Sequence, residues 1–336
     1  MKKIKITKTN IMFLILDILA LACIFLAYGP ITYFRNLFIT TSIATTSHQY
    51  LARTIYTDKM IADILSKNYV EEITSSTDAS AIEFNNEDSG VYDSIYEEQI
   101  LKRDEGNDLY KVIPIDEGTY KGYLVAIYDP SRVSLGISRK LHIGGQELDD
   151  MAEDLGAIVA MNASGFDYAG GDAIRAAGVV IKDGKIFSSG GSTGFDGRLI
   201  GFNSDNVLVL TTDDPMTAIE KGMIDAVEFG PFLIVNGQSS NIVGNGGFGI
   251  APRTAIGQRK DGIVLFLVID GRNPGYSLGA DMSDLIKIFE RYKAYNAANL
   301  DGGGSSTLAI NGEIINDPKG YGYVGGRYLA NSWILK

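Results

Sequence analysis

The segment 299–307 brings together an acid, several hydroxyl groups and bare backbone. It reads Asn299, Leu300, Asp301, Gly302, Gly303, Gly304, Ser305, Ser306 and Thr307. Three consecutive glycines remove every side chain from the turn, so several backbone N–H groups can face one ligand. With Asp301 and the hydroxyls beside it, the turn predicts a site for an anionic or polyhydroxylated ligand. A plain glycine turn is the alternative that composition leaves open.

Three other short segments place a charged or amide side chain at a strand end. Asp270 and Arg272 follow the most apolar run of the chain, 263–269, and one glycine separates them. Residues two apart on an extended chain project the same way, so this pair can face one ligand. Arg253 enters another short strand, and Asn162 follows a strand expected at 157–161. Taken singly, each segment also fits a purely structural role.

Two glycine-rich motifs fail because of their context. Residues 244–249 spell the dinucleotide fingerprint GxGxxG, but Pro252 follows within three residues, where a helix is required. Residues 190–194 spell the nucleophile motif GxSxG around Ser192, yet no helical pattern follows and both histidines precede it. We therefore expect neither a dinucleotide site nor a serine nucleophile here.

Short β-rich runs separated by turn signals dominate the chain after residue 110. Strands are expected at 123–128, 133–137, 157–161, 207–210 and 263–269, with hairpins at 179–187 and 308–315. Apolar residues at helical spacing predict helices at 146–155 and 281–292, the second capped by Asp281. Strands outnumber helices and regular strand–helix alternation is missing. The expected fold class is α+β, a single domain with a mixed or mostly antiparallel sheet and a few helices.

Charge and cysteine content exclude several classes of function. Asp and Glu outnumber Lys and Arg by 41 to 30, a formal net charge of −11, which disfavours nucleic acid as a partner. Cys23 is the only cysteine, so an intrachain disulfide framework and a multi-cysteine zinc site are excluded. With His48 and His142 as the only histidines, we expect no metal centre built on histidines and no cofactor. The sequence leaves binding of a divalent ion open.

The N-terminal segment is typical of a membrane anchor. Lysines at positions 2, 3, 5 and 8 precede residues 11–28, which are apolar apart from Asp17 and long enough to cross a bilayer once. The positive-inside rule places residues 1–10 in the cytoplasm and the chain after about residue 30 outside the cell. The expected location is therefore the cell membrane, crossed once. Cleavage as a signal peptide, or lipidation at Cys23, is the alternative.

Residues 29–109 are expected to connect this anchor to the main domain, 110–336. Within the connector, residues 58–67 set apolar side chains on one helical face. From Glu71 to Gln99 there are nine acidic residues and no basic one, with polar stretches between them. This composition predicts a solvated stalk or loop.

The ordered motifs of residues 110–336 resemble those of the phosphodiester glycosidase family. They are NASGF at 162–166, FGPFLIVNG at 229–237, APRTAIG at 251–257, VIDGR at 268–272, NLDGGGSST at 299–307 and NDP at 316–318. The resemblance implies a hydrolase that cleaves the glycosidic bond of a sugar 1-phosphodiester outside the cell. The anchor, an HQYLA segment and the acidic stretch look like those of bacterial membrane-attached members linked to exopolysaccharides. A sugar phosphodiester or phosphorylated polysaccharide of the envelope is then the expected partner.

The resemblance also implies how the residues divide the chemistry. We expect Arg253 and Arg272 to grip the phosphate, because a departing phosphate monoester needs its charge neutralised. The backbone of residues 302–304 and the hydroxyls of Ser305 and Ser306 would supply further donors to the same phosphate.

The expected carboxylates are Asp301, Asp270 and Glu228. Asp301 and Asp270 would stabilise the oxocarbenium-like carbon or activate water, with Glu228 in reserve. Asn162, Asn299 and Thr307 would hold sugar hydroxyls. Two other functions remain open on the sequence: a non-catalytic module that binds glycans or teichoic-acid-like chains, and a transferase that moves a sugar phosphate onto a polymer.

Overall fold

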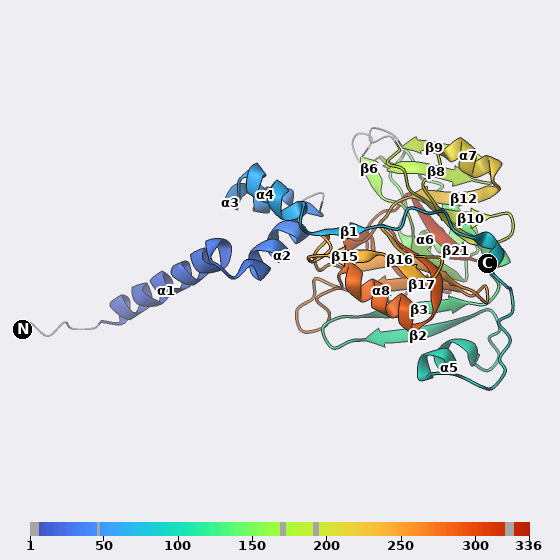
Figure 1. Cartoon of the computed structure of the whole chain (residues 1–336), viewed down its shortest axis with the longest axis horizontal. Helices are drawn as coiled ribbons and strands as arrows, with labels where there is room; N and C mark the ends of the chain where they lie inside the picture. The colour runs from blue at the N-terminus through green and yellow to red at the C-terminus, as the bar shows by residue number, and fades with distance from the viewer. Residues whose placement is uncertain (1–6, 46–47, 169–172, 191–194, 320–325) are drawn as a thin grey trace, which may run out of the picture.

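The structure of the chain is a computed structural model that describes residues 7–45, 48–168, 173–190, 195–319 and 326–336. Three large antiparallel sheets form the body, with helices around them and a helical N-terminal arm (Figure 1). The α+β prediction is confirmed, although the strands form three sheets instead of one. Residues 1–6 of the expected cytoplasmic end and Ser192 of the rejected motif lie outside the described residues.

The strands are arranged so that neighbours in each sheet run antiparallel. The seven-stranded sheet has the order β14 (Gln238–Ser239), β13 (Phe232–Val235), β18 (Ala294–Asn299), β16 (Arg253–Arg259), β17 (Val264–Ile269), β3 (Lys121–Ile127) and β2 (Tyr110–Asp116). A five-stranded sheet has the order β11 (Leu208–Thr211), β10 (Leu199–Asn203), β12 (Met223–Glu228), β8 (Gly178–Lys182) and β9 (Lys185–Gly190). Another has the order β20 (Glu313–Ile314), β19 (Leu308–Ile310), β5 (Val159–Asn162), β21 (Asn331–Leu335) and β4 (Val133–Ile137). Two short pairs complete the set, β6 (Phe166–Tyr168) with β7 (Ile174–Ala176) and β1 (Tyr69–Glu71) with β15 (Asn241–Val243).

Strand β17 shows why one run of the sequence is apolar throughout. Its side chains alternate between two faces, as the period of a strand dictates. Val264, Phe266 and Val268 pack in the central core, which side chains of all three large sheets share. The alternate residues pack in a second core, against α8 (Met282–Arg291) and α5 (Ile95–Leu101). Both faces are buried, so no polar alternation is possible along this strand.

The helices of the body cover the outer faces of the sheets. α6 (Leu148–Leu155) packs on the sheet that contains β5, and α7 (Pro215–Glu220) packs on the sheet that contains β12. The Asp281 side chain accepts a hydrogen bond from the N–H of Asp284 and thereby caps α8, as the sequence predicts. The expected helices at 146–155 and 281–292 and both expected hairpins are confirmed.

The acidic segment that was expected to form a solvated stalk lies along the body of the molecule. The carboxylate of Glu72 accepts hydrogen bonds from Arg198 and from the N–H of Phe232. Further along, the side chain of Ile100 in α5 is fully buried in the second core. The stalk alternative is therefore wrong, whereas the loop alternative is confirmed for residues 72–78 and 82–94, which form neither helix nor strand. Most acidic side chains of the segment are exposed, while Glu72 and Ile82 pack on the domain.

The N-terminal arm consists of an apolar helix and three shorter ones. α1 (Lys8–Tyr28) projects away from the body, is 21 residues long and contains no buried residue (Figure 1). By length and composition it is the one helix among the described residues that can cross a membrane. α2 (Thr32–Ile43), α3 (Gln49–Ile55) and α4 (Asp58–Leu65) link it to the body. The apolar helix is confirmed, and its insertion in a membrane stays a prediction.

Candidate active site

Three of the predicted segments meet at one edge of the seven-stranded sheet. Strand β16 lies between β17 and β18 and is antiparallel to both, so its beginning pairs with the ends of its neighbours. Arg253 pairs with Ile269, directly before Asp270. Ala255 pairs with Asn299, at the start of the glycine segment. The antiparallel register thus collects residues that lie up to 46 positions apart in the sequence.

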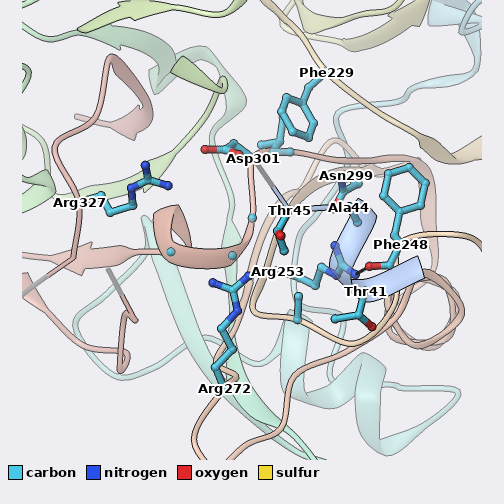
Figure 2. A pocket seen from close by; sticks show the side chains of 15 residues that line it. Thr41, Ala44, Thr45, Phe229, Phe248, Arg253, Arg272, Asn299, Asp301 and Arg327 are labelled. Carbon is cyan, nitrogen blue, oxygen red and sulfur yellow. Dashed lines mark hydrogen bonds between the residues drawn. The ribbon is translucent and has the colours of Figure 1, made fainter. Parts of the chain in front are cut away.

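A cavity of about 170 Å³ opens at this edge (Figure 2). Its wall contains part of the predicted set, namely Asp301, Gly302, Gly303, Gly304, Arg253, Arg272 and Asn299. It also contains residues to which the sequence assigned no role, namely Arg327, Phe229, Phe248, Ala251, Leu300, Thr41, Ala44 and Thr45. The wall is therefore built from the body and from the end of α2.

Asp301 brings a carboxyl group into this cavity. Its N–H donates to the carbonyl of Ala163 (3.2 Å), and its own carbonyl accepts from Nδ2 of Asn162 (2.6 Å). Burial raises the pKa of Asp301 to about 6, while the Ser305 hydroxyl, the charge of Arg327 and a backbone N–H lower it by less. This carboxyl is therefore mostly ionised at neutral pH and takes up a proton in mildly acidic solution.

Arg253 is held firmly by backbone carbonyl groups. Its Nε donates to the carbonyl of Ala280 (3.0 Å), and its Nη2 donates to the carbonyls of Phe248 (2.9 Å) and Gly249 (2.5 Å). Burial lowers the pKa of Arg253 to about 10, so the group stays charged at neutral pH. Backbone carbonyls therefore fix the position of this guanidinium, and the charges of Asp281 and Asp284 also act on it.

Arg272 and Arg327 add two further cations, and neither has a carboxylate within ion-pair distance among the described residues. Arg272 adopts a left-handed backbone conformation (φ 56°), and its guanidinium lies next to Gly303, where a Cβ would come within 3.1 Å of Nη2. The guanidinium of Arg327 stacks 4.7 Å from the ring centre of Phe166. Burial and repulsion by Arg327 lower the pKa of Arg272. Figure 2 shows both side chains gathered with Asp301 around the glycine turn, an arrangement suited to an anion.

Sequence reasoning missed Arg327. It follows the stretch YGYVGG, which has neither strand nor helix periodicity, and it precedes β21. The signal that could have found it is the one that marked Arg272: a cation directly after glycine, next to a buried strand. The aromatic residues Phe229 and Phe248 gave no such signal, because single phenylalanines are usually core residues.

The structure does not bring Asp270 into the wall of the cavity. The residue is 1% exposed, and its carboxylate accepts hydrogen bonds from Nδ2 of Asn316 (2.9 Å), the N–H of Asp317 (2.9 Å) and the hydroxyl of Tyr276 (3.2 Å). Burial raises the pKa of Asp270, and these hydrogen bonds oppose the rise. The Asp270 carboxylate thus connects the loop that follows β17 and contains Arg272, here named the Arg272 loop, to residues 316–317.

Glu228 is likewise absent from the described wall. Its carboxylate accepts from the N–H groups of Val179 (2.7 Å) and Asp196 (2.6 Å), and burial raises its pKa. The three expected carboxylates therefore occupy separate surroundings, and only Asp301 of the three lines the cavity. In the described part of the chain, no three His, Cys, Asp or Glu side chains are grouped closely enough to hold a metal ion.

Asn162 is a brace inside the protein and does not line the cavity. It is completely buried; its Oδ1 accepts from the hydroxyl of Thr254 (2.8 Å) and the N–H of Thr307 (3.1 Å), and its Nδ2 holds the Asp301 carbonyl. Because the amide is occupied by protein groups, the expectation that Asn162 holds sugar hydroxyls is not supported. Its contacts position the backbone of Asp301.

The hydroxyl residues after the glycine turn lie behind it. Ser305, Ser306 and Thr307 are each 1% exposed and are not part of the described wall. The hydroxyls of Ser306 and Thr307 and Oδ1 of Asn299 have no hydrogen-bond partner among the described residues. Asn299 does line the cavity, and its Nδ2 donates to the carbonyl of Gly230 (2.8 Å). This amide oxygen is buried, so the expected contact of Asn299 with a sugar hydroxyl stays a prediction.

Comparison with known proteins settles the family. A family model for phosphodiester glycosidases matches residues 155–336, more than half of the chain. The chain belongs to the phosphodiester glycosidase family. The matched region contains the glycine turn, the Arg272 loop and Arg327, and so it holds the whole cavity wall except the contribution of α2.

Similar curated proteins are longer than this chain. The prophage-derived uncharacterized protein YomE of Bacillus subtilis is 31% identical over 174 residues, which are 50% of this chain and 26% of YomE. The N-acetylglucosamine-1-phosphodiester alpha-N-acetylglucosaminidase of Bos taurus is 27% identical over 188 residues, 51% of this chain and 34% of that enzyme. The chain thus spans between a quarter and about two fifths of the curated relatives that it matches.

A solved structure shares the fold. The catalytic domain of the zebrafish N-acetylglucosamine-1-phosphodiester alpha-N-acetylglucosaminidase, auto-inhibited by its pro-peptide, aligns with a TM-score of 0.56 at 20% identity. The alignment covers 69% of this chain and 85% of the zebrafish domain. At this identity the likeness establishes the arrangement of the sheets.

Proposed function

We propose that this chain is an extracytoplasmic hydrolase that cleaves the glycosidic bond of a sugar 1-phosphodiester in an envelope or exopolysaccharide glycan. One observation carries the proposal: Asp301 shares a single cavity with Arg272 and Arg327, two cations without a carboxylate partner in the described chain. The mammalian relatives, named as N-acetylglucosamine-1-phosphodiester glycosidases, support the same reaction.

The chemistry of the leaving group explains why one carboxyl and three arginines suffice. A typical glycosidase protonates a poor leaving oxygen with a carboxylic acid. A phosphate monoester has a second pKa near ~6 and departs without much protonation. Arg253, Arg272 and Arg327 neutralise the charge that it gains, and the N–H groups of residues 302–304 add donors.

The reaction itself exchanges one bond at the anomeric carbon. The C1–O bond to the phosphate breaks, the phosphate keeps the electron pair, and the oxygen of a water molecule bonds to C1 and loses a proton. Ionised Asp301 stabilises the positive charge that develops on the sugar or accepts that proton. Asp270 and Asn162 act on this step indirectly, because they hold the Arg272 loop and the Asp301 backbone.

The N-terminal arm supports an anchored location for this hydrolase. Three lysines precede the exposed apolar helix α1 and a fourth, Lys8, begins it, which favours a single crossing with the N-terminus in the cytoplasm and the domain outside the cell. This location would bring the site to the envelope polymers that the proposal names as substrates.

Turnover of a soluble sugar 1-phosphodiester tests the assignment of the residues. In the full chain, Asp301→Asn and Arg272→Ala should each lower kcat/KM by roughly 10²-fold or more. Arg139→Ala, which removes an exposed arginine that pairs with Asp154 outside the cavity wall, is the matched control and should retain the wild-type rate. Wild-type turnover by both site variants would refute the assignment. An added alcohol separates hydrolysis from transfer, since a transferase that moves a sugar phosphate would yield a new phosphodiester between that sugar and the alcohol in preference to free sugar.

A further inference from the structure

The three helices after α1 form a small unit, which we name the juxtamembrane cluster (α2, α3 and α4, residues 32–65) (Figure 1). Apolar side chains of the three helices and of the end of α1 share one core. The hydroxyl of Tyr28 donates to the carbonyl of Ile55 (2.5 Å). The hydroxyl of Tyr56 donates to the carbonyl of Ala27 (3.3 Å). The cluster is therefore joined to the last turn of the apolar helix by packing and by hydrogen bonds.

The same cluster contacts the active-site edge of the body. Nδ2 of Asn245 donates to the hydroxyl of Thr40 (3.0 Å). Thr41 packs so tightly on Gly249 that a Cβ there would come within 2.0 Å of its hydroxyl oxygen. Thr41 and Thr45 then line the cavity (Figure 2). Since the 12 residues of α2 span about 18 Å, one short helix connects the end of α1 to the wall of the site.

The outward face of the cluster is apolar and aromatic. Tyr33 and Phe34 in the first turn of α2 are 61% and 51% exposed. On α3, Leu51 and Ile55 are exposed and lie on one face, because they are four positions apart, and Tyr50 is also exposed. Exposed tyrosine, phenylalanine and aliphatic side chains next to an apolar helix are typical of a surface that sits at the level of lipid headgroups.

The juxtamembrane cluster and the body also differ in the sign of their net charge. Residues 29–68 carry four Lys or Arg and two Asp or Glu, whereas residues 69–336 carry 22 and 38. An anionic lipid surface therefore attracts the cluster and repels the body. The two forces together favour an orientation in which the edge where α2 meets the cavity faces the membrane.

We infer that the juxtamembrane cluster lies on the lipid surface and that the natural substrate is a sugar 1-phosphodiester carried by a membrane-anchored molecule. The inference rests on the proposed hydrolase function and names the class of its substrate. A free sugar phosphodiester offers the same chemistry to the arginines, but only an anchored one is concentrated within reach of a site that α2 holds beside the bilayer.

Two substrates with the same sugar phosphate test this in vesicles of phosphatidylcholine and phosphatidylglycerol that contain the full chain. One is the methyl ester, which is soluble; the other is the diacylglycerol ester, which is embedded in the vesicle. At equal total concentration, we expect the embedded ester to be cleaved about tenfold faster or more, because confinement to the surface raises its effective concentration. The variants Tyr33→Ser/Phe34→Ser and Tyr50→Ser/Ile55→Ser should lose most of this advantage and keep wild-type turnover of the soluble ester.

A matched control alters equally exposed apolar residues elsewhere. Val91 and Ile95 are 75% and 66% exposed, and Ile95 begins α5, which lies on the side of the body away from α1 (Figure 1), so Val91→Ser/Ile95→Ser should change neither rate. Equal cleavage of both esters by the wild type, or an unchanged advantage in both cluster variants, would overturn the inference and leave the hydrolase intact. Failure to cleave either ester would instead count against the proposed function, and loss of soluble turnover in the cluster variants would mean that this face binds within the protein and not to lipid.

Discussion

At the scale of single residues, Asp301 is subject to two opposing influences. Burial favours its neutral form and raises its pKa to about 6, while Arg327 and the Ser305 hydroxyl favour the ionised form. A phosphodiester does not titrate in this range, so any titration near pH 6 belongs to the protein. The protonation of this one carboxyl should therefore be visible in the rate.

The pH profile of kcat/KM checks this directly. Because the raised pKa means that Asp301 is neutral below about 6 and ionised above it, kcat/KM should be flat above pH 7 and fall roughly tenfold per pH unit below about pH 5.5. Asp270→Asn is the control, since the Asp270 carboxyl is also buried with a raised pKa but lies outside the cavity wall. If the fall of kcat/KM at acidic pH disappeared in Asp270→Asn, the titrating carboxyl would be that of Asp270 and not that of Asp301. This result would contradict the account.

Arg327 is the residue that most sharply separates the structure from the sequence prediction. Replacing Arg327 with Ala removes a charge-assisted donor to the phosphate and should lower kcat/KM by about 10- to 100-fold, and Arg327→Lys should restore part of the loss. Steady-state kinetics on a soluble sugar 1-phosphodiester measures the change. A rate within twofold of wild type for Arg327→Ala would remove Arg327 from the phosphate site.

The sequence predicted which residues lie at the site more reliably than it predicted the role of each residue. Asp301, Arg253, Arg272 and Asn299 were expected in the site and do line the cavity. Asn162 was assigned to the sugar, because an asparagine at a strand end gives no indication that Thr254 and the chain at 301–307 will occupy its amide. Hydrogen bonds between segments distant in sequence leave no periodic signal, and that is where the prediction of the site failed.

At the scale of elements, the glycine turn is the part that brings bare backbone to the arginines. Gly303 has a left-handed φ of 63°, and a Cβ there would press on the Arg272 guanidinium. Hairpin residue Gly312 also has a left-handed φ, 80°, but a Cβ there would meet nothing within 4 Å. The two positions share the backbone strain and differ in their distance from the cavity.

This pair allows a controlled prediction. Gly303→Ala and Gly312→Ala should both destabilise the fold by about 1–2 kcal/mol, because each forces alanine into the left-handed region. Only Gly303→Ala should also lower kcat/KM, by about tenfold, since it displaces Arg272 and fills space for the anion. Equal activity of the two variants, at equal thermal stability, would show that the turn does not contact the substrate.

Strands and helices were predicted well because local patterns specify them. The alternation of β17 between two buried faces appears in the sequence as a continuous apolar run, and the Asp281 cap marks the start of α8. The division into three sheets was not predictable, because strand order depends on contacts far apart in sequence. The prediction of a stalk for the acidic segment failed for a related reason. Its composition is typical of a solvated stalk, but Glu72 pairs with Arg198, 126 residues away.

At the scale of the whole molecule, the segment before residue 110 belongs to the fold. β1 pairs with β15, Glu72 holds β13 through the N–H of Phe232, and Ile100 fills the second core. A chain that begins at residue 110 loses all of these contacts. A chain that begins at residue 30 keeps them and lacks only the apolar helix.

The stability of these two chains tests the domain boundary. We expect the chain from residue 110 to be less stable than the chain from residue 30 by about 3 kcal/mol or more, since burial of one isoleucine side chain alone contributes about 1.5–3 kcal/mol. Denaturant unfolding followed by circular dichroism measures the difference. Equal midpoints and slopes would mean that residues 110–336 fold independently and that the acidic segment is only an appendage.

The central claim, attack of water at the sugar carbon with phosphate as the leaving group, is tested most directly by hydrolysis in ¹⁸O-labelled water. The wild-type chain should convert a sugar 1-phosphodiester into free sugar and a phosphate monoester, with the label on the anomeric oxygen of the sugar and none on the phosphate at early times. Asp301→Asn should give little product of either kind. Label on the phosphate would show cleavage at phosphorus and would contradict the account, as would the absence of sugar release across glucosamine-, glucose- and glycerol-phosphate-linked substrates.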